Sequence, residues 1–148
     1  MTMNTTAPDS EVLAAFACQQ VVARMSSAFD AGNYQAGLAH YAPDAVWHRP
    51  DGVLSGIDQI AGYYGNRSPS LVICHVLTNF VVDFDAEGIA TCSYYSMGFL
   101  QKSDEKRTLP VAMPGVGVLW RYHDRLARTE AGWKVIERRA DRIYEPMG

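Results

Sequence analysis

Two polar residues, His75 and Asn79, interrupt an otherwise apolar stretch that runs from residue 71 to residue 84. Because they lie four positions apart, a strand would place both side chains on the same face. A polar pair on a buried strand must be hydrogen-bonded within the protein or line a cavity. An imidazole in a cavity can act as a general acid or base near neutral pH. Residue type alone favours a structural histidine over a working one.

Other kinds of catalytic site find little support in the sequence. The four histidines are widely spaced and form none of the short motifs that hold a metal ion. There is no G-x-S-x-G nucleophile motif, and Gly115-Val116-Gly117 is not followed by a helical pattern, as a dinucleotide loop would be. The sequence therefore predicts neither a metal site nor a cofactor.

Composition points to an ordinary globular chain with a single hydrophobic core. The chain has 148 residues, of which 48% are hydrophobic, and a formal net charge of −3. No basic cluster predicts nucleic-acid binding, and we expect the arginines near the C-terminus to lie on solvated strand faces: Arg121, Arg125, Arg128, Arg138, Arg139 and Arg142.

Three cysteines without a CxxC pair fit a reducing, cytoplasmic setting. We expect no signal peptide, because the N-terminus lacks a basic segment followed by an apolar run. No apolar stretch is expected to cross a membrane. Residues 1–8 are polar and predicted to be disordered, and residues 9–148 are predicted to form one domain.

Helices are predicted in the first half of the chain. The first spans about residues 11–31 and ends at Asp30-Ala31-Gly32, where the glycine suits the left-handed position after a helix. Two short helices follow at about residues 33–41 and 57–64, separated by a strand at residues 45–48 and a turn at residues 49–52.

Long strands are predicted after residue 69, at residues 71–84, 89–100, 111–128 and 133–143. The continuous apolar character of residues 71–84 predicts a strand that is buried on both faces. A charged loop is expected at residues 102–107. Helices followed by a run of long antiparallel strands indicate an α+β fold, with the helices on one face of a strongly curved sheet.

The segment FDAGNYQAGLAHYAPDAVWHRPDGVLSGIDQIAGYY resembles the helical half of SnoaL-like proteins of the nuclear transport factor 2-like superfamily. VLWRYHDRLARTEAGWKVIERR resembles their closing hairpin, and with ICHVLTN the resemblance covers roughly residues 10–143. It implies a cone-shaped, cystatin-like fold whose curved sheet wraps a helix and opens into a pocket. Proteins with this fold include scytalone dehydratase, ketosteroid isomerase, polyketide cyclases and the small subunits of ring-hydroxylating dioxygenases, so the fold alone does not decide function.

The resemblance assigns pocket positions to Asp30 and His75, as in scytalone dehydratase-like proteins. An acid beside an imidazole can fix its tautomer and stabilise its charged form. Those proteins carry a second pocket histidine on the next strand, where this chain has CSYYSMGF, so the resemblance does not extend to that residue of scytalone-type dehydration. Tyr94 could replace that histidine if Asn79 faces Tyr94 and His75 faces Gly98, whereas a slip of one residue would substitute Tyr95.

From these residues we expect a cofactor-independent lyase or isomerase that acts on a small, largely apolar, cyclic ligand. His75 would be the acid or base, Asp30 its orienting partner, and Tyr94 and Tyr122 hydrogen-bond donors to the substrate. The substrate pocket is expected to contain few polar groups and to be lined by Phe16, Trp47, Tyr63, Leu77, Asn79 and Trp120.

A second hypothesis is a non-catalytic protein, either a small-ligand binder or a structural subunit like that of the dioxygenases. The resemblance also implies a homodimer, formed through the outer sheet face that carries Arg121, His123 and Arg125.

Overall fold

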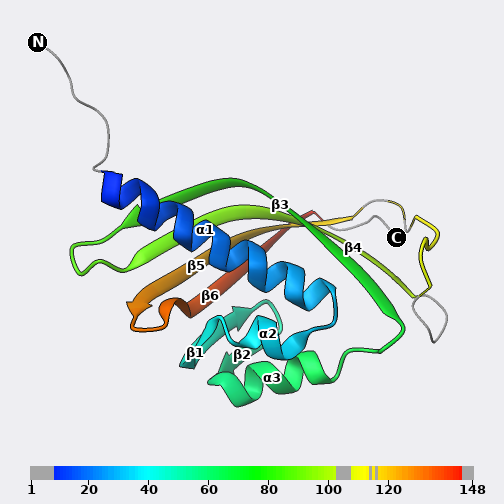
Figure 1. Ribbon diagram of the computed structural model, residues 1–148. Helices are drawn as coiled ribbons and strands as arrows, with labels where there is room; N and C mark the ends of the chain where they lie inside the picture. The colour runs from blue at the N-terminus through cyan, green and yellow to red at the C-terminus, as the bar shows by residue number, and fades with distance from the viewer. Residues whose placement is uncertain (1–8, 103–107, 114, 116, 145–148) are drawn as a thin grey trace, which may run out of the picture.

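The structure is a computed structural model that describes residues 9–102, 108–113, 115 and 117–144. Helices α1 (Asp9–Asp30), α2 (Tyr34–Leu38) and α3 (Ile57–Gly65) lie on one side of a six-stranded sheet (Figure 1). The strands are β1 (Tyr41–Arg49), β2 (Gly52–Ser55), β3 (Leu71–Phe84), β4 (Ala90–Lys102), β5 (Val118–Thr129) and β6 (Gly132–Tyr144).

The sheet has the order β2-β1-β6-β5-β4-β3, and all neighbours are antiparallel except β1 and β6. This arrangement confirms the predicted α+β class. Strand β2 was not predicted, because its sequence was assigned to a turn and the start of a helix. Residues 1–8, predicted to be disordered, and most of the predicted charged loop lie outside the described residues.

The end of α1 is fixed by a glycine in the left-handed conformation, as predicted. Gly32 has φ of 75° and donates its N–H to the carbonyl of Phe29, while Asn33 donates to the carbonyl of Ala28. These two hydrogen bonds satisfy carbonyls that the helix would otherwise leave unpaired. The cap therefore determines that Asp30 is the last residue of the helix.

Strand β3 is an edge strand, and its side chains alternate between the interior and solvent. The prediction that it is buried on both faces is therefore wrong. Its apolar outward residues, such as Val76 and Val81, are 51% and 55% exposed. An unbroken apolar run does not distinguish a strand covered on both faces from one whose outer face is also apolar.

A β-bulge divides β3 into two halves. Towards the turn Val81 pairs with Ser93, and beyond the bulge Thr78 pairs with Tyr95, so Asn79 and Phe80 together oppose Tyr94. Asn79 occupies the bulge with φ of 57°, a conformation that asparagine tolerates better than most residues. The predicted pairing of His75 with Gly98 is confirmed, although Phe84 pairs with Ala90 and not with Ile89.

Strand β5 begins later than predicted, at Val118 and not at residue 111. The described residues between Thr108 and Gly117 form no strand, which agrees with the strand-breaking character of Pro110 and Gly115.

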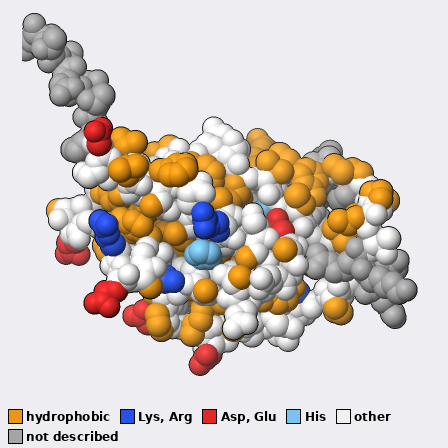
Figure 2. All heavy atoms as spheres, viewed as in Figure 1, with side chains coloured by type: hydrophobic (Ala, Val, Ile, Leu, Met, Phe, Trp, Pro, Cys, Tyr) orange, Lys and Arg blue, Asp and Glu red, His pale blue; other side chains and the backbone are white. Residues whose placement is uncertain are grey.

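Helix α1 packs one face on the sheet through Cys18, Val22, Met25 and Phe29, all buried. The N-terminal part of α1 also exposes apolar side chains, and hydrophobic atoms cover this region of the surface (Figure 2). By length and composition alone α1 could cross a membrane, contrary to the expectation from sequence, but a helix that packs on a core passes the same test.

Candidate active site

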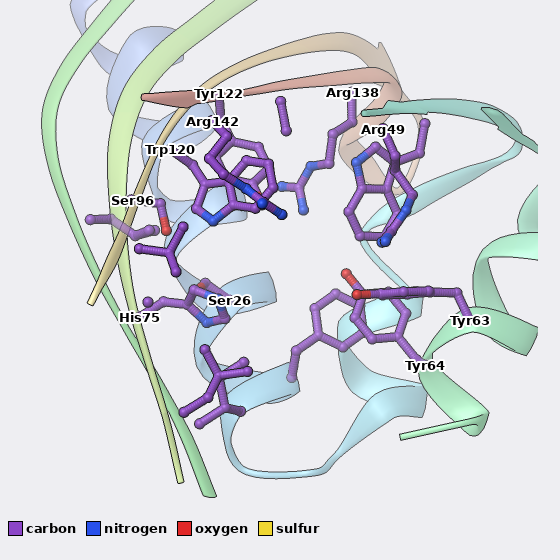
Figure 3. A pocket seen from close by; sticks show the side chains of 18 of the residues that line it. Ser26, Arg49, Tyr63, Tyr64, His75, Ser96, Trp120, Tyr122, Arg138 and Arg142 are labelled. Carbon is purple, nitrogen blue, oxygen red and sulfur yellow. The ribbon is translucent and has the colours of Figure 1, made fainter. Parts of the chain in front are cut away.

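A cavity of about 390 Å³ lies between the helices and the inner face of the sheet. Its size suits a small organic ligand. Figure 3 shows His75, Ser26 and Ser96 on one side and Arg49, Tyr63 and Tyr64 on the other. Seven of the residues singled out from sequence line this cavity: Trp47, Tyr63, His75, Leu77, Tyr94, Trp120 and Tyr122.

The structure brings Asp30 and His75 into direct contact. Asp30 Oδ1 lies 2.6 Å from His75 Nδ1, and Asp30 Oδ2 accepts a hydrogen bond of 2.7 Å from the backbone N–H of His75. Because β3 is an edge strand, the outward N–H of His75 has no neighbouring strand to pair with. One carboxylate therefore satisfies the strand edge and orients the imidazole.

This contact leaves the second ring nitrogen of His75 for the cavity. A carboxylate only accepts hydrogen bonds, so Nδ1 carries the proton and Nε2 presents a lone pair in the neutral ring. A Cβ atom added at Gly98 would lie 3.5 Å from Nε2. The glycine thus keeps that nitrogen uncrowded, as the predicted pairing of His75 with Gly98 implies.

Two serines beside His75 were not predicted. Ser26 lies four residues before Asp30 on α1, and Ser96 lies two residues after Tyr94 on β4, so each shares a face with a residue that was predicted. Both line the cavity, and Ser96 is only 1% exposed. The spacing to a predicted site residue was the available signal for each serine.

Tyr94 faces inward, which resolves the alternative between Tyr94 and Tyr95. Its hydroxyl donates a hydrogen bond of 2.7 Å to Oδ2 of Asp124, which is fully buried. Burial raises the pKa of Tyr94 well above the usual value for a phenol. Its proton is thus already engaged within the protein, and the predicted role of Tyr94 as donor to a substrate would require this bond to break.

Asp124 also binds Arg138, a residue that was expected on a solvated face. Arg138 Nε donates to Oδ1 and Nη2 to Oδ2, each at 2.8 Å, and the arginine is 6% exposed. Burial alone would lower the pKa of Arg138, but the Asp124 carboxylate outweighs burial and holds it well above the usual range. The expectation for Arg138 is therefore wrong, because its cross-strand partner makes burial possible.

Tyr122 is the predicted donor that remains available. Its ring stacks on Tyr94 with centroids 5.4 Å apart, and no hydrogen bond joins its hydroxyl to another residue in the described part of the chain. Burial raises the pKa of Tyr122, so the phenol keeps its proton at neutral pH. Tyr122 can therefore donate to an oxygen atom of a ligand.

Arginine side chains make the cavity far more polar than predicted. Four of them line it: Arg49, Arg67, Arg138 and Arg142. The expectation of few polar groups is wrong for this reason. Arg142 was expected on a solvated face and is exposed, but it also borders the cavity, and its guanidinium lies 4.7 Å from the centre of the Trp120 ring.

Two predicted lining residues lie elsewhere. Phe16 is 58% exposed on α1, because the buried face of the helix passes through other positions. Asn79 is exposed at the bulge, where its side chain accepts a hydrogen bond from the Thr78 hydroxyl. The bulge turns Phe80 inward, and that ring contacts Tyr94 with centroids 5.2 Å apart.

Comparisons with known proteins agree with this architecture. The sequence profile of the SnoaL-like domain matches residues 10–139. A search of curated proteins finds no match.

Solved structures from Novosphingobium aromaticivorans share the fold. A candidate aromatic ring hydroxylase is 23% identical with a TM-score of 0.74, and the match covers 95% of this chain and 94% of that one. A candidate scytalone dehydratase is 16% identical with a TM-score of 0.75, and covers 92% and 88%. A protein described as NTF2-like with a cystatin-like fold is 16% identical with a TM-score of 0.71, and covers 88% and 82%.

Proposed function

This chain belongs to the SnoaL-like family, and from that premise we propose that it is a cofactor-independent lyase or isomerase. The observation that carries the proposal is the pair formed by Asp30 and His75 at the wall of the cavity, with atoms 2.6 Å apart. An imidazole held by a carboxylate and open to a ligand on its other nitrogen is a typical general acid–base unit.

The chemistry that suits this unit is proton transfer next to a carbonyl group. His75 Nε2 takes a proton from the carbon beside the carbonyl, and the C–H electrons move to the carbonyl oxygen as an enolate. Return of the proton to another carbon gives an isomer. Departure of a hydroxyl group from the neighbouring carbon, which takes the proton from His75, instead releases water and gives the dehydrated product.

The enolate oxygen needs hydrogen-bond donors on the wall of the cavity. Tyr122 and Ser96 line the same cavity as His75 and carry hydroxyl groups that can fill this role. Asp30 meanwhile stabilises the imidazolium that forms after the proton is taken. Every step exchanges protons within one substrate, so the reaction needs no redox group.

A solvent-exchange experiment tests the proposal. The protein is incubated in deuterated buffer with 2-tetralone, a bicyclic ketone with exchangeable carbon-bound hydrogens, and deuterium incorporation is followed by mass spectrometry. We expect the protein to accelerate exchange over buffer, and His75→Gln to reduce the protein-dependent rate by about 10²–10⁴-fold. Asp30→Asn should also reduce it, because asparagine has one acceptor oxygen for the two donors of His75 and no negative charge to stabilise the imidazolium.

His123→Gln is the matched control, since His123 bonds to Ser93 through its Nδ1 at 2.8 Å and does not line the cavity. It should leave the exchange rate unchanged. Equal rates for the wild type and His75→Gln would overturn the proposal. A wild type that never exceeds the buffer rate over a panel of cyclic ketones would favour a non-catalytic binding role.

A further inference from the structure

The described wall of the cavity is rich in arginine and lacks carboxylates. Four arginines line it, whereas no described Asp or Glu does. The acidic partners stand behind the wall: Asp124 binds Arg138, and Asp30 binds His75. A ligand in the cavity would therefore contact the arginine side chains directly. The carboxylates of Asp124 and Asp30 lie behind the residues that they bind.

Arg49 and Arg67 concentrate this charge on the side of the cavity opposite His75. The guanidinium carbon of Arg49 lies 3.9 Å from the centre of the Tyr63 ring, and that of Arg67 lies 5.6 Å from it. The acidic partner of Arg49 is Asp51, whose side chain is 71% exposed, so solvent weakens its compensation.

Arg67 has hydrogen-bonding capacity that the described residues leave unused. Its Nη1 is buried and has no hydrogen-bond partner among them. A buried donor nitrogen without an acceptor is unfavourable, and an acceptor brought by a ligand would relieve it.

Tyr63 lies between the same two arginines and feels their charge. Burial acts to raise the pKa of its phenol, but Arg49 and Arg67 outweigh burial, and the pKa lies below the usual value. The phenol therefore lies in a strongly positive environment. An anionic ligand group would be stabilised in the same place for the same reason.

The geometry points to an anion subsite formed by Arg49, Tyr63 and Arg67, which binds a carboxylate on the substrate. Two guanidiniums and a phenol supply donors that suit the two carboxylate oxygens. Across the cavity from Arg49 and Tyr63, His75 faces the reactive part of the same molecule (Figure 3). The ligand is therefore a cyclic carboxylic acid. That this acid is a substrate rests on the proposed function, whereas the anion subsite itself does not.

A matched pair of ligands tests the subsite without turnover. Binding of 2-naphthoate and of the neutral 2-naphthamide, which is similar in size, is measured by calorimetry. We expect the acid to bind at least about tenfold more tightly, because guanidinium groups form stronger hydrogen bonds with a carboxylate than with a neutral amide oxygen. Arg67→Met should remove most of this preference and leave the affinity for the amide nearly unchanged.

Two further variants serve as controls. Arg128→Met removes an exposed arginine from β5 outside the cavity and should keep the full preference. His75→Gln should keep it as well, because the carboxylate binds on the opposite side. A loss in His75→Gln would instead assign the anion to the imidazole and overturn the inference.

Equal binding of acid and amide to the wild type, or an equal loss of both in Arg67→Met, would also overturn it. A melting temperature for each variant verifies that it is folded. If the protein fails to exchange deuterium but still prefers the acid, the proposed function fails and the anion subsite stands.

Discussion

The fold should depend strongly on the charge of Asp124. This residue is fully buried and accepts hydrogen bonds from Tyr94 and, through two nitrogens, from Arg138. In Asp124→Asn the guanidinium stays buried without a counter-charge, and the amide nitrogen of asparagine faces donors. Breaking one side of such a buried pair lowers the free energy of unfolding by about 3–5 kcal/mol, and we expect that loss here.

The assay is urea unfolding followed by intrinsic fluorescence and circular dichroism. Arg125→Met is the matched control, because Arg125 pairs with Glu137 at 3.2 Å across the same two strands but is 44% exposed. Its effect should stay below about 1 kcal/mol. If Asp124→Asn lowers the free energy of unfolding no more than this control does, the argument from buried charge is refuted.

A second, milder variant tests the same argument in case Asp124→Asn does not fold. Tyr94→Phe removes the hydroxyl that donates to Asp124 and accepts from Nη2 of Arg138, while the ion pair stays intact, and should lower the free energy of unfolding by about 1.5–3 kcal/mol. If Tyr94 serves Asp124 and not the substrate, this variant should also leave the deuterium-exchange rate of the folded protein close to that of the wild type. A folded Tyr94→Phe protein that has lost exchange would return the residue to the catalytic role predicted from sequence.

Further predictions concern the bulge, the thiols and one phenol. Asn79→Gly should preserve the free energy of unfolding in urea, whereas Asn79→Val should lower it by about 1–2 kcal/mol, because valine resists positive φ; equal values would contradict the bulge. Ellman's reagent should label only the exposed Cys74 in the native protein at neutral pH, and all three cysteines after denaturation. Cys18 and Cys92 are buried, and burial raises their pKa to about 11 and about 12. Rapid labelling of a second thiol in the native protein would contradict this prediction. Tyr63→Phe should remove the first phenolate to form in an alkaline absorbance titration, because two guanidiniums outweigh burial and lower the pKa of that phenol.

The contact between Asp30 and His75 was expected from the resemblance to scytalone dehydratase-like proteins, and local sequence signals predicted only part of the geometry that produces it. Gly32 determines where α1 ends, and this position makes Asp30 the final helical residue. The pairing of His75 with Gly98 was predicted from a turn that pairs Phe84 with Ile89. The turn instead pairs Phe84 with Ala90, and the bulge at Asn79 shifts the strand back into the predicted register. The end of the helix depends on local propensity, which one sequence displays directly, whereas the bulge was not predicted.

The charge of the cavity could not be predicted in the same way. An arginine in a strand is usually solvated, and Arg138 is buried only because Asp124 lies opposite it on a neighbouring strand. Arg67 lies in a connection whose path depends on the packing of α3 and β3. Burial of a charged residue depends on partners distant in sequence, and no local pattern identifies them.

The bulge in β3 also bears on how chain length can change in this family. If Asn79 were deleted, Thr78 would still oppose Tyr95, Val81 would still oppose Ser93, and Phe80 alone would oppose Tyr94. Every side chain would keep its face, and only the local bend would be lost. Deletion of a single residue is therefore tolerable at this position of the strand, whereas elsewhere in β3 it would exchange the two faces. Homologous strands that differ in length by one residue can thus present the same histidine to the same helix end.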